Sequence, residues 1–183
     1  MSDIIQEAQR CLKCKKPLCK EGCPVQTEIP TIMQMFLEGK MDEAGELLFK
    51  NNPLSAICSL ICPHEKNCMG HCVLNHKNSP IKFFEVENYI SSFFLDKARL
   101  QPHEKNGHLV GIIGAGPAGL TLAILLAQRG YEVTIIDSKD KIGGVLRYGI
   151  PEFRLPKSLL DKLLDRMKDL GIQFRPNTLI GPT

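Results

Sequence analysis

All eight cysteines of this 183-residue chain lie within its first 72 residues, and none follows. They form two groups, each with a Cys-Pro pair: Cys11-x2-Cys14-x4-Cys19-x3-Cys23-Pro24 and Cys58-x3-Cys62-Pro63-x5-Cys68-x3-Cys72. Such gaps let a loop place several thiolates around one inorganic centre, and a terminal Cys-Pro is typical of a ligand that serves a second centre. Spacing alone leaves iron–sulfur clusters and zinc equally open, with a disulfide framework as a third alternative.

The compartment bears on this choice. The N-terminal residues are polar, and no run of about 18 uncharged apolar residues occurs, so we predict neither a signal peptide nor a membrane span and expect a cytoplasmic protein. Thiols stay reduced there, which favours bound metal or clusters over disulfides. The net charge is only +3, without a basic stripe interleaved with aromatic residues, so no nucleic-acid partner is predicted.

Hydrophobic periodicity divides the chain into two parts. Helical spacing over residues 28–38, 41–50 and 81–97, the first capped by Thr27, predicts an all-α domain over residues 1–100. A polar linker follows at residues 101–108. From residue 109 onward, short apolar strands alternate with helices, which predicts a parallel sheet. The expected strands are 109–113, 131–136 and 172–175, and the expected helices are 117–129 and 157–170.

A glycine motif lies between the first strand and the helix that follows it. Gly114 permits the tight turn, Gly116 lets a pyrophosphate approach the backbone, and Gly119 lets the helix pack on the strand. Asp137 follows Gly119 by 18 positions and is predicted to bind ribose hydroxyls and repel a 2′-phosphate, which favours FAD or NAD over NADP. The alternative is a structural glycine turn without a ligand. A nucleotide-binding unit C-terminal to the cysteine groups favours iron–sulfur clusters over zinc.

Several motifs together resemble the small subunit of NADPH-dependent glutamate synthase over the whole chain. They are the cysteine pattern, the Gly114 turn, and the segments TEIP (27–30), NPL (52–54) and IGGVLRYGIPEFRLP (142–156). The N-terminal part of dihydropyrimidine dehydrogenase and the large subunit of NADH-dependent ferredoxin:NADP oxidoreductase share the module. The resemblance implies an all-α iron–sulfur domain with two [4Fe-4S] clusters, followed by an incomplete α/β Rossmann-like, parallel-sheet FAD-binding domain over residues 109–183.

The resemblance also implies ligands, residue by residue. One cluster would be held by Cys11, Cys14, Cys19 and Cys72, and the other by Cys23, Cys62, Cys68 and Glu87. In the alternative, Cys58 is the eighth ligand and Glu87 is an ordinary solvated helix residue. The histidines are not expected to be ligands. FAD would be bound by Gly114, Ala115, Gly116, Pro117, Ala118, Gly119, Asp137, Gly143, Gly144, Val145 and Arg154.

Members of this family continue past residue 183 with an NADPH-binding domain and a segment that completes the FAD domain. We therefore expect a truncated piece, without its own NADPH site and inactive alone. In the intact protein, NADPH would reduce FAD, and electrons would pass singly through the clusters to a large catalytic subunit or another electron acceptor. No side chain is predicted to act as acid, base or nucleophile. The alternative is a zinc-containing nucleotide-binding or partner-docking module without redox activity.

Overall fold

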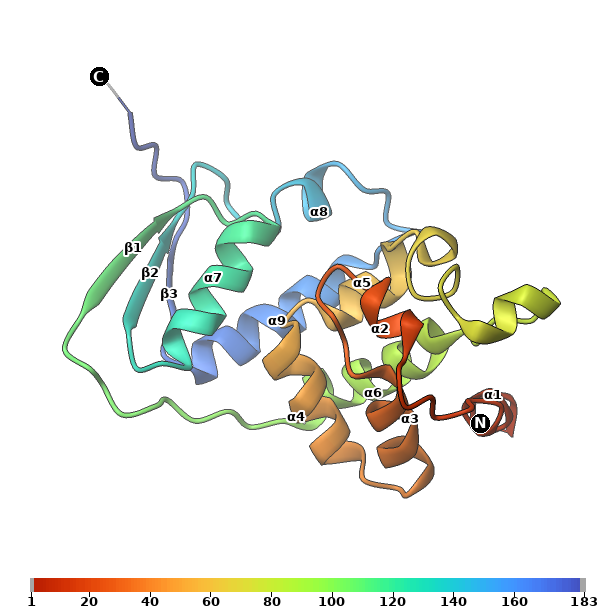
Figure 1. Cartoon of the computed structure of the whole chain (residues 1–183). Coiled ribbons are helices and arrows are strands. Elements are labelled where there is room, and N and C mark those ends of the chain that lie inside the picture. The colour runs from red at the N-terminus through yellow and green to blue at the C-terminus, as the bar shows by residue number, and fades with distance from the viewer. Residues whose placement is uncertain (1, 182–183) are drawn as a thin grey trace. The chain divides into compact units, whose positions relative to one another are not determined.

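A computed structural model describes residues 2–181 of the chain (Figure 1). The chain divides after residue 94 into two compact units, and the stretch 101–106 in the second unit has neither helix nor strand. None of the helices within the described residues combines the length and apolarity needed to cross a bilayer.

The first unit is built from helices and short 3-10 turns. Its elements are α1 (Ser2–Gln9), α2 (Leu18–Glu21), α3 (Ile29–Leu37), α4 (Met41–Asn51), α5 (Ser55–Ile61), η1 (His64–Lys66), η2 (Val73–Lys77) and α6 (Phe83–Lys97). The apolar faces of α3, α4 and α6 meet in a core that fully buries Ile32, Leu48 and Ile90. Gly39 adopts φ +74° just beyond α3, as expected for a left-handed residue that ends a helix.

The prediction that Thr27 caps α3 is wrong. Glu28 precedes the helix without a side-chain capping bond, and Thr27 is buried. The Thr27 hydroxyl instead donates to Asn51 Oδ1 at 3.1 Å and lies 3.4 Å from Cys23 Sγ. A hydroxyl that finds a distant side-chain acceptor is not available to the helix end. Thr27 therefore ties the first cysteine segment to α4.

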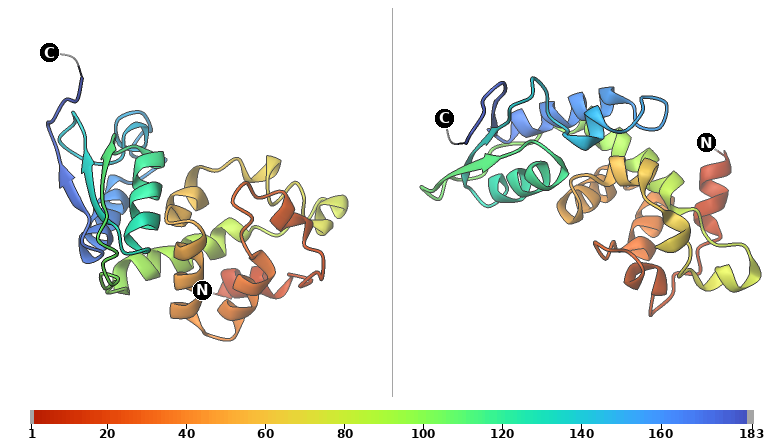
Figure 2. Two further views of the ribbon diagram at one scale, coloured as in Figure 1. Left: turned by 60° about the vertical axis from the view of Figure 1, so that its left-hand side comes forward. Right: turned by 90° about the horizontal axis from the view of Figure 1, so that it is seen from above.

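The second unit contains a three-stranded parallel sheet in the order β1-β2-β3. Its elements are β1 (Leu109–Ile113), α7 (Pro117–Ala127), β2 (Glu132–Ile136), α8 (Val145–Tyr148), α9 (Lys157–Asp169) and β3 (Gln173–Arg175). Right-handed crossovers between consecutive parallel strands place α7 and α9 on one face of the sheet, as both views in Figure 2 show. Leu120, Ile135 and Leu160 are fully buried there. Leu109 and Ile113 remain exposed.

Candidate functional site

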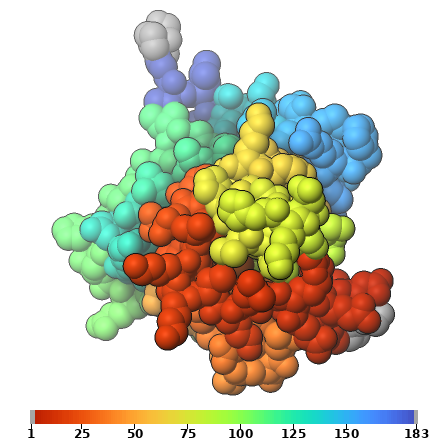
Figure 3. All heavy atoms as spheres, turned by 45° about the vertical axis from the view of Figure 1, so that its right-hand side comes forward, coloured from red at the N-terminus to blue at the C-terminus, as the bar shows by residue number. Residues whose placement is uncertain are grey.

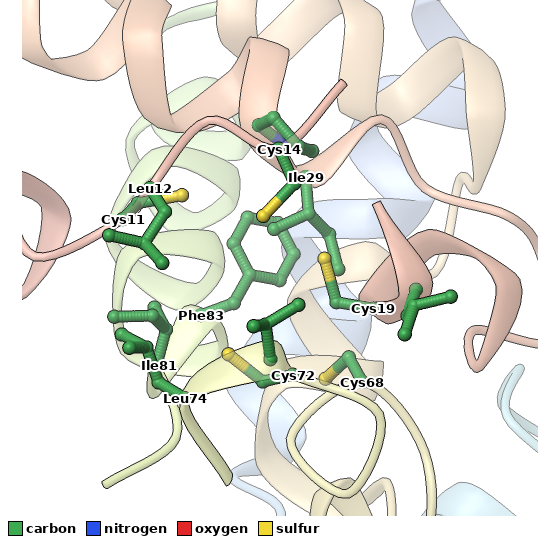
Figure 4. A pocket seen from close by; sticks show the side chains of 13 residues that line it. Cys11, Leu12, Cys14, Cys19, Ile29, Cys68, Cys72, Leu74, Ile81 and Phe83 are labelled. Atoms are coloured by element: carbon green, nitrogen blue, oxygen red, sulfur yellow. The ribbon is translucent and has the colours of Figure 1, made fainter. Parts of the chain in front are cut away.

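The first cysteine pocket lies in the helical unit and receives thiols from both cysteine groups. Figure 4 shows the sulfur atoms of the labelled cysteines turned toward a common space beside Phe83. The cysteines that line this pocket are Cys11, Cys14, Cys19, Cys68 and Cys72. The structure thus brings together all four residues predicted to hold one cluster, and it adds Cys68 to the same wall.

Backbone conformation explains how so short a loop achieves this. Lys13 adopts φ +50°, a left-handed conformation that few residues other than glycine adopt, and it bends the chain between Cys11 and Cys14. Helix α2 begins at Leu18, after a short connection that ends in Pro17, and it carries Cys19. From the second group, Cys72 lies at the start of η2. Two separate stretches therefore close around one pocket.

The second cysteine pocket shares a wall with the first, because Ile29, Cys68 and Phe83 line both. Its other cysteines are Cys23, Cys58 and Cys62, and its polar lining includes Thr27, Asn52, His64, Asn67 and Glu87. All four residues predicted for the other cluster therefore lie together. Cys58, the alternative eighth ligand, lines the same pocket, so both candidates are in place.

Two asparagines donate hydrogen bonds to cysteine sulfurs of the second pocket. Asn52 Nδ2 lies 3.3 Å from Cys58 Sγ, and Asn67 Nδ2 lies 3.2 Å from Cys62 Sγ. Amide donors of this kind favour the thiolate over the thiol. The sequence analysis did not single out either asparagine. Sequence spacing does not predict these contacts, because each depends on how the segment that carries the asparagine packs against α5 and its C-terminal end.

Burial controls the charge of the pocket groups. It raises the pKa of Cys68 to about 12 and the pKa values of Cys19 and Cys58 to about 11, with neighbouring acidic groups adding to the effect. Burial alone raises the pKa of Glu87 to about 8. Burial therefore favours the neutral forms of these groups, and a positive centre bound between them would favour their anionic forms.

Glu87 is not a solvated helix residue, contrary to the alternative interpretation. Its exposed fraction is 6%, and among the described residues its carboxyl group has no hydrogen-bond or ion-pair partner. His64, on the same wall, is also buried and stacks on Phe84 with 4.5 Å between ring centroids. In the part of the chain that the structure describes, its Nε2 atom has no hydrogen-bond partner either. Unpaired buried polar groups are costly, so a group bound in this pocket would gain stability by pairing with them.

The donor set of both pockets fits iron–sulfur clusters. Within residues 2–181, no three His, Cys, Asp or Glu side chains converge closely enough to hold a single metal ion. The thiols instead line the walls of two adjacent pockets. Soft thiolates on the walls of a pocket suit a multi-iron centre, whose positive iron would also stabilise buried anions.

The glycine motif has a distinct geometry at each of its three positions. Gly114 adopts φ +103°, which only glycine tolerates readily. A Cβ atom on Gly116 would meet nothing within 4 Å, so this backbone faces open space at the start of α7. A Cβ atom on Gly119 would overlap the carbonyl oxygen of Gly114. Open backbone at a helix N-terminus is the arrangement that accepts a phosphate group.

A second glycine segment lies against the first. Gly143 N donates to the Ala115 carbonyl at 2.8 Å, and a Cβ atom on Gly144 would lie 2.8 Å from Gly116 Cα. Val145 follows as an exposed residue at the start of α8. The segments 114–118 and 143–145, both predicted to bind the cofactor, are thus brought together.

Asp137 contacts the glycine turn, whereas Arg154 lies exposed to solvent. Asp137 Oδ2 accepts a hydrogen bond from Ala115 N at 2.6 Å, and Oδ1 accepts one from Lys139 N at 2.8 Å. The carboxylate thus holds the glycine turn and keeps further lone pairs for a ligand. Arg154 is exposed, and among the described residues no side-chain contact ties it to the glycine segments.

Two thiol-lined pockets and a Rossmann-like nucleotide unit define an iron–sulfur protein with a dinucleotide-binding part. Comparison with known families agrees: residues 1–99 match the model "Dihydropyrimidine dehydrogenase domain II, 4Fe-4S cluster", and residues 112–158 match "NAD(P)-binding Rossmann-like domain". The chain belongs to the dihydropyrimidine dehydrogenase domain II family of 4Fe-4S proteins. The predicted resemblance and fold class are confirmed.

Curated relatives include two kinds of redox subunit. The chain is 37% identical over 180 residues to the glutamate synthase [NADPH] small chain of Azospirillum brasilense, covering 96% of this chain and 37% of the relative. It is 37% identical over 179 residues to the NAD-dependent dihydropyrimidine dehydrogenase subunit PreT of Salmonella typhimurium, covering 97% and 43%. For the Escherichia coli glutamate synthase [NADPH] small chain, the identity is 35% over 178 residues, with 96% and 38% covered. The chain therefore spans about two fifths of these relatives.

Proposed function

We propose that the chain is the electron-transfer portion of an NADPH-dependent flavin and iron–sulfur oxidoreductase similar to the glutamate synthase small subunit. In this function, electrons pass between FAD and a partner through two [4Fe-4S] clusters. The observation that carries the proposal is the pair of adjacent cysteine pockets with a shared wall at Ile29, Cys68 and Phe83. Adjacent centres suit single-electron transfer, which is the chemistry that bound clusters supply.

The proposed ligands divide between the pockets. Cys11, Cys14, Cys19 and Cys72 would hold the first cluster, and Cys23, Cys62, Cys68 and Glu87 the second. Cys68 lines both pockets, so its assignment to the second rests on the family resemblance. Asn67 would keep its amide hydrogen bond to the Cys62 sulfur, and the apolar side chains of the first pocket would exclude water.

The second unit is proposed to bind the dinucleotide. The pyrophosphate would lie on the open backbone at Gly116–Ala118, and Asp137 would contact ribose while it holds the Ala115 amide. Gly143, Gly144, Val145 and Arg154 would contribute to the same site. The matched model describes NAD(P) binding, and the choice of FAD rests on the resemblance. The partner would be a large catalytic subunit or another electron acceptor, and NADPH would bind only in a longer protein.

The direct test is chemical analysis of the whole chain, purified and reconstituted without oxygen. We expect a brown protein with about eight iron and about eight sulfide per chain, the content of two [4Fe-4S] clusters, together with bound or bindable FAD. A colourless protein that contains zinc or linked cystines would instead support the module without redox activity.

A further inference from the structure

Basic charge is concentrated in the two segments that supply most of the lining of the first cysteine pocket, residues 10–22 and 69–82. They carry seven basic side chains against one acid, Glu21, which gives these segments a net charge of +6 in a chain whose total is +3. The basic residues are Arg10, Lys13, Lys15, Lys16, Lys20, Lys77 and Lys82. The remainder of the chain is therefore acidic on balance.

Part of this charge is neutralised locally and part is not. Arg10 pairs with Glu7, Lys20 with Glu28, and Lys82 with Glu85. The remaining four lysines of the two segments have no ion pair among the described residues and are exposed to solvent: Lys13, Lys15, Lys16 and Lys77. These four exposed lysines give the segments a positive potential that attracts negatively charged groups.

Exposed aliphatic side chains accompany these lysines. The exposed fractions are 59% for Leu12, 42% for Leu18 and 41% for Val73, and all three side chains line the first pocket. Figure 3 shows the red atoms of the N-terminal segment beside the yellow to yellow-green atoms of residues 69–82 on one face. We call these three aliphatic residues and the four unpaired lysines the pocket rim.

We propose that the pocket rim is the docking surface for a separate redox protein that presents acidic side chains around an apolar contact. Exposed apolar groups bordered by charge mark interaction sites, and opposite charge on a partner steers its approach. A second copy of this chain does not fit, because two rims of the same positive charge repel. The inference rests on the proposed function, since it names the kind of partner that exchanges electrons with the first cluster.

The test uses the reconstituted full chain and a reduced plant-type [2Fe–2S] ferredoxin, an acidic one-electron donor, as the probe. Oxidation of the ferredoxin and reduction of the chain's cluster are followed by stopped-flow absorption. The variant Lys15→Glu/Lys16→Glu reverses charge at the rim. Its matched control, Lys50→Glu/Lys97→Glu, reverses two exposed lysines that lie outside the rim and have no ion pair with any residue that the structure describes. It changes the net charge equally.

At low ionic strength, the rim variant is expected to lower the second-order rate constant about 10-fold or more, and salt is expected to remove most of the difference. The control variant is expected to stay within about twofold of the unsubstituted protein, because it leaves the local charge unchanged. The substitution Leu12→Gln is expected to slow transfer several-fold at every salt concentration.

Three results would overturn the proposal. Equal slowing by both double variants would show an effect of net charge only. Unchanged rates in both would show that the rim is not used. A change in cluster midpoint potential large enough to explain the slower rate would show that the lysines act on the cluster and not on a partner. A chain without clusters would instead refute the proposed function, and absorption and iron analysis detect that case separately.

Discussion

At the scale of single residues, Glu87 gives the clearest test of the proposed cluster ligands. Within residues 2–181 it is a buried carboxyl group without a hydrogen-bond or ion-pair partner, in a pocket lined by four cysteines. If it completes the second cluster, Glu87→Ala will lower the iron content from about eight to about four per chain, whereas Cys58→Ser will leave it unchanged. Iron analysis and electron paramagnetic resonance of the reduced protein would measure this. Loss of a cluster in Cys58→Ser alone would assign the ligand to Cys58.

Asn67 provides a second residue-scale prediction. Its amide donates to the Cys62 sulfur, and such a bond stabilises the more negative, reduced state of a cluster. Asn67→Ala should therefore lower the midpoint potential of one cluster by roughly tens of millivolts. Asn75→Ala is the control, because Asn75 donates to the Gly70 carbonyl and not to sulfur. Equal shifts in both variants, measured by redox titration, would argue against a specific role.

At the scale of elements, two glycines of one motif should respond in opposite ways. Gly119→Ala places a Cβ atom onto the Gly114 carbonyl oxygen and should destabilise the second unit by about 1–3 kcal/mol. Gly116→Ala enters open space at φ −78° and should leave stability unchanged while it weakens FAD binding. Thermal unfolding and a flavin fluorescence titration would separate the two. Unimpaired FAD binding by Gly116→Ala would contradict the proposed pyrophosphate site.

The elements also show what a sequence can predict. Periodicity located α3, α4, α6 and all three strands within about two residues, because each element buries one apolar face. Helix α2 and helix α8 have four residues each, too few for any period to appear. The cap at Thr27 failed because its acceptor, Asn51, lies 24 positions away.

In the candidate site, too, sequence patterns predicted some residues and missed others. Cysteine spacing and the family resemblance predicted two ligand sets, and the fold gathers each set on one pocket. The supporting side chains of Asn52, Asn67 and His64 were not predicted, because their contacts depend on tertiary packing that has no local pattern. Sequence patterns therefore predict the proposed cluster ligands more readily than the side chains that hydrogen-bond to them or pack beside them.

At the scale of the whole molecule, the chain should bind nucleotide without oxidising NADPH. It contains one G-x-G-x-x-G motif, and that motif is proposed to serve FAD. We expect no steady NADPH oxidation above background when an artificial electron acceptor is supplied. Chemically reduced protein should still pass electrons to the same acceptor, which is the positive control. Steady turnover with NADPH would contradict this prediction.

The wall common to both pockets links the fate of one bound cluster to that of the other. Cys68 and Phe83 line both pockets. If each pocket holds a cluster as proposed, oxidative breakdown of either cluster would disturb side chains that shield its neighbour. Damage to the two centres should therefore be coupled. In air, a chain that has lost one centre should lose the other faster than an intact chain loses its first.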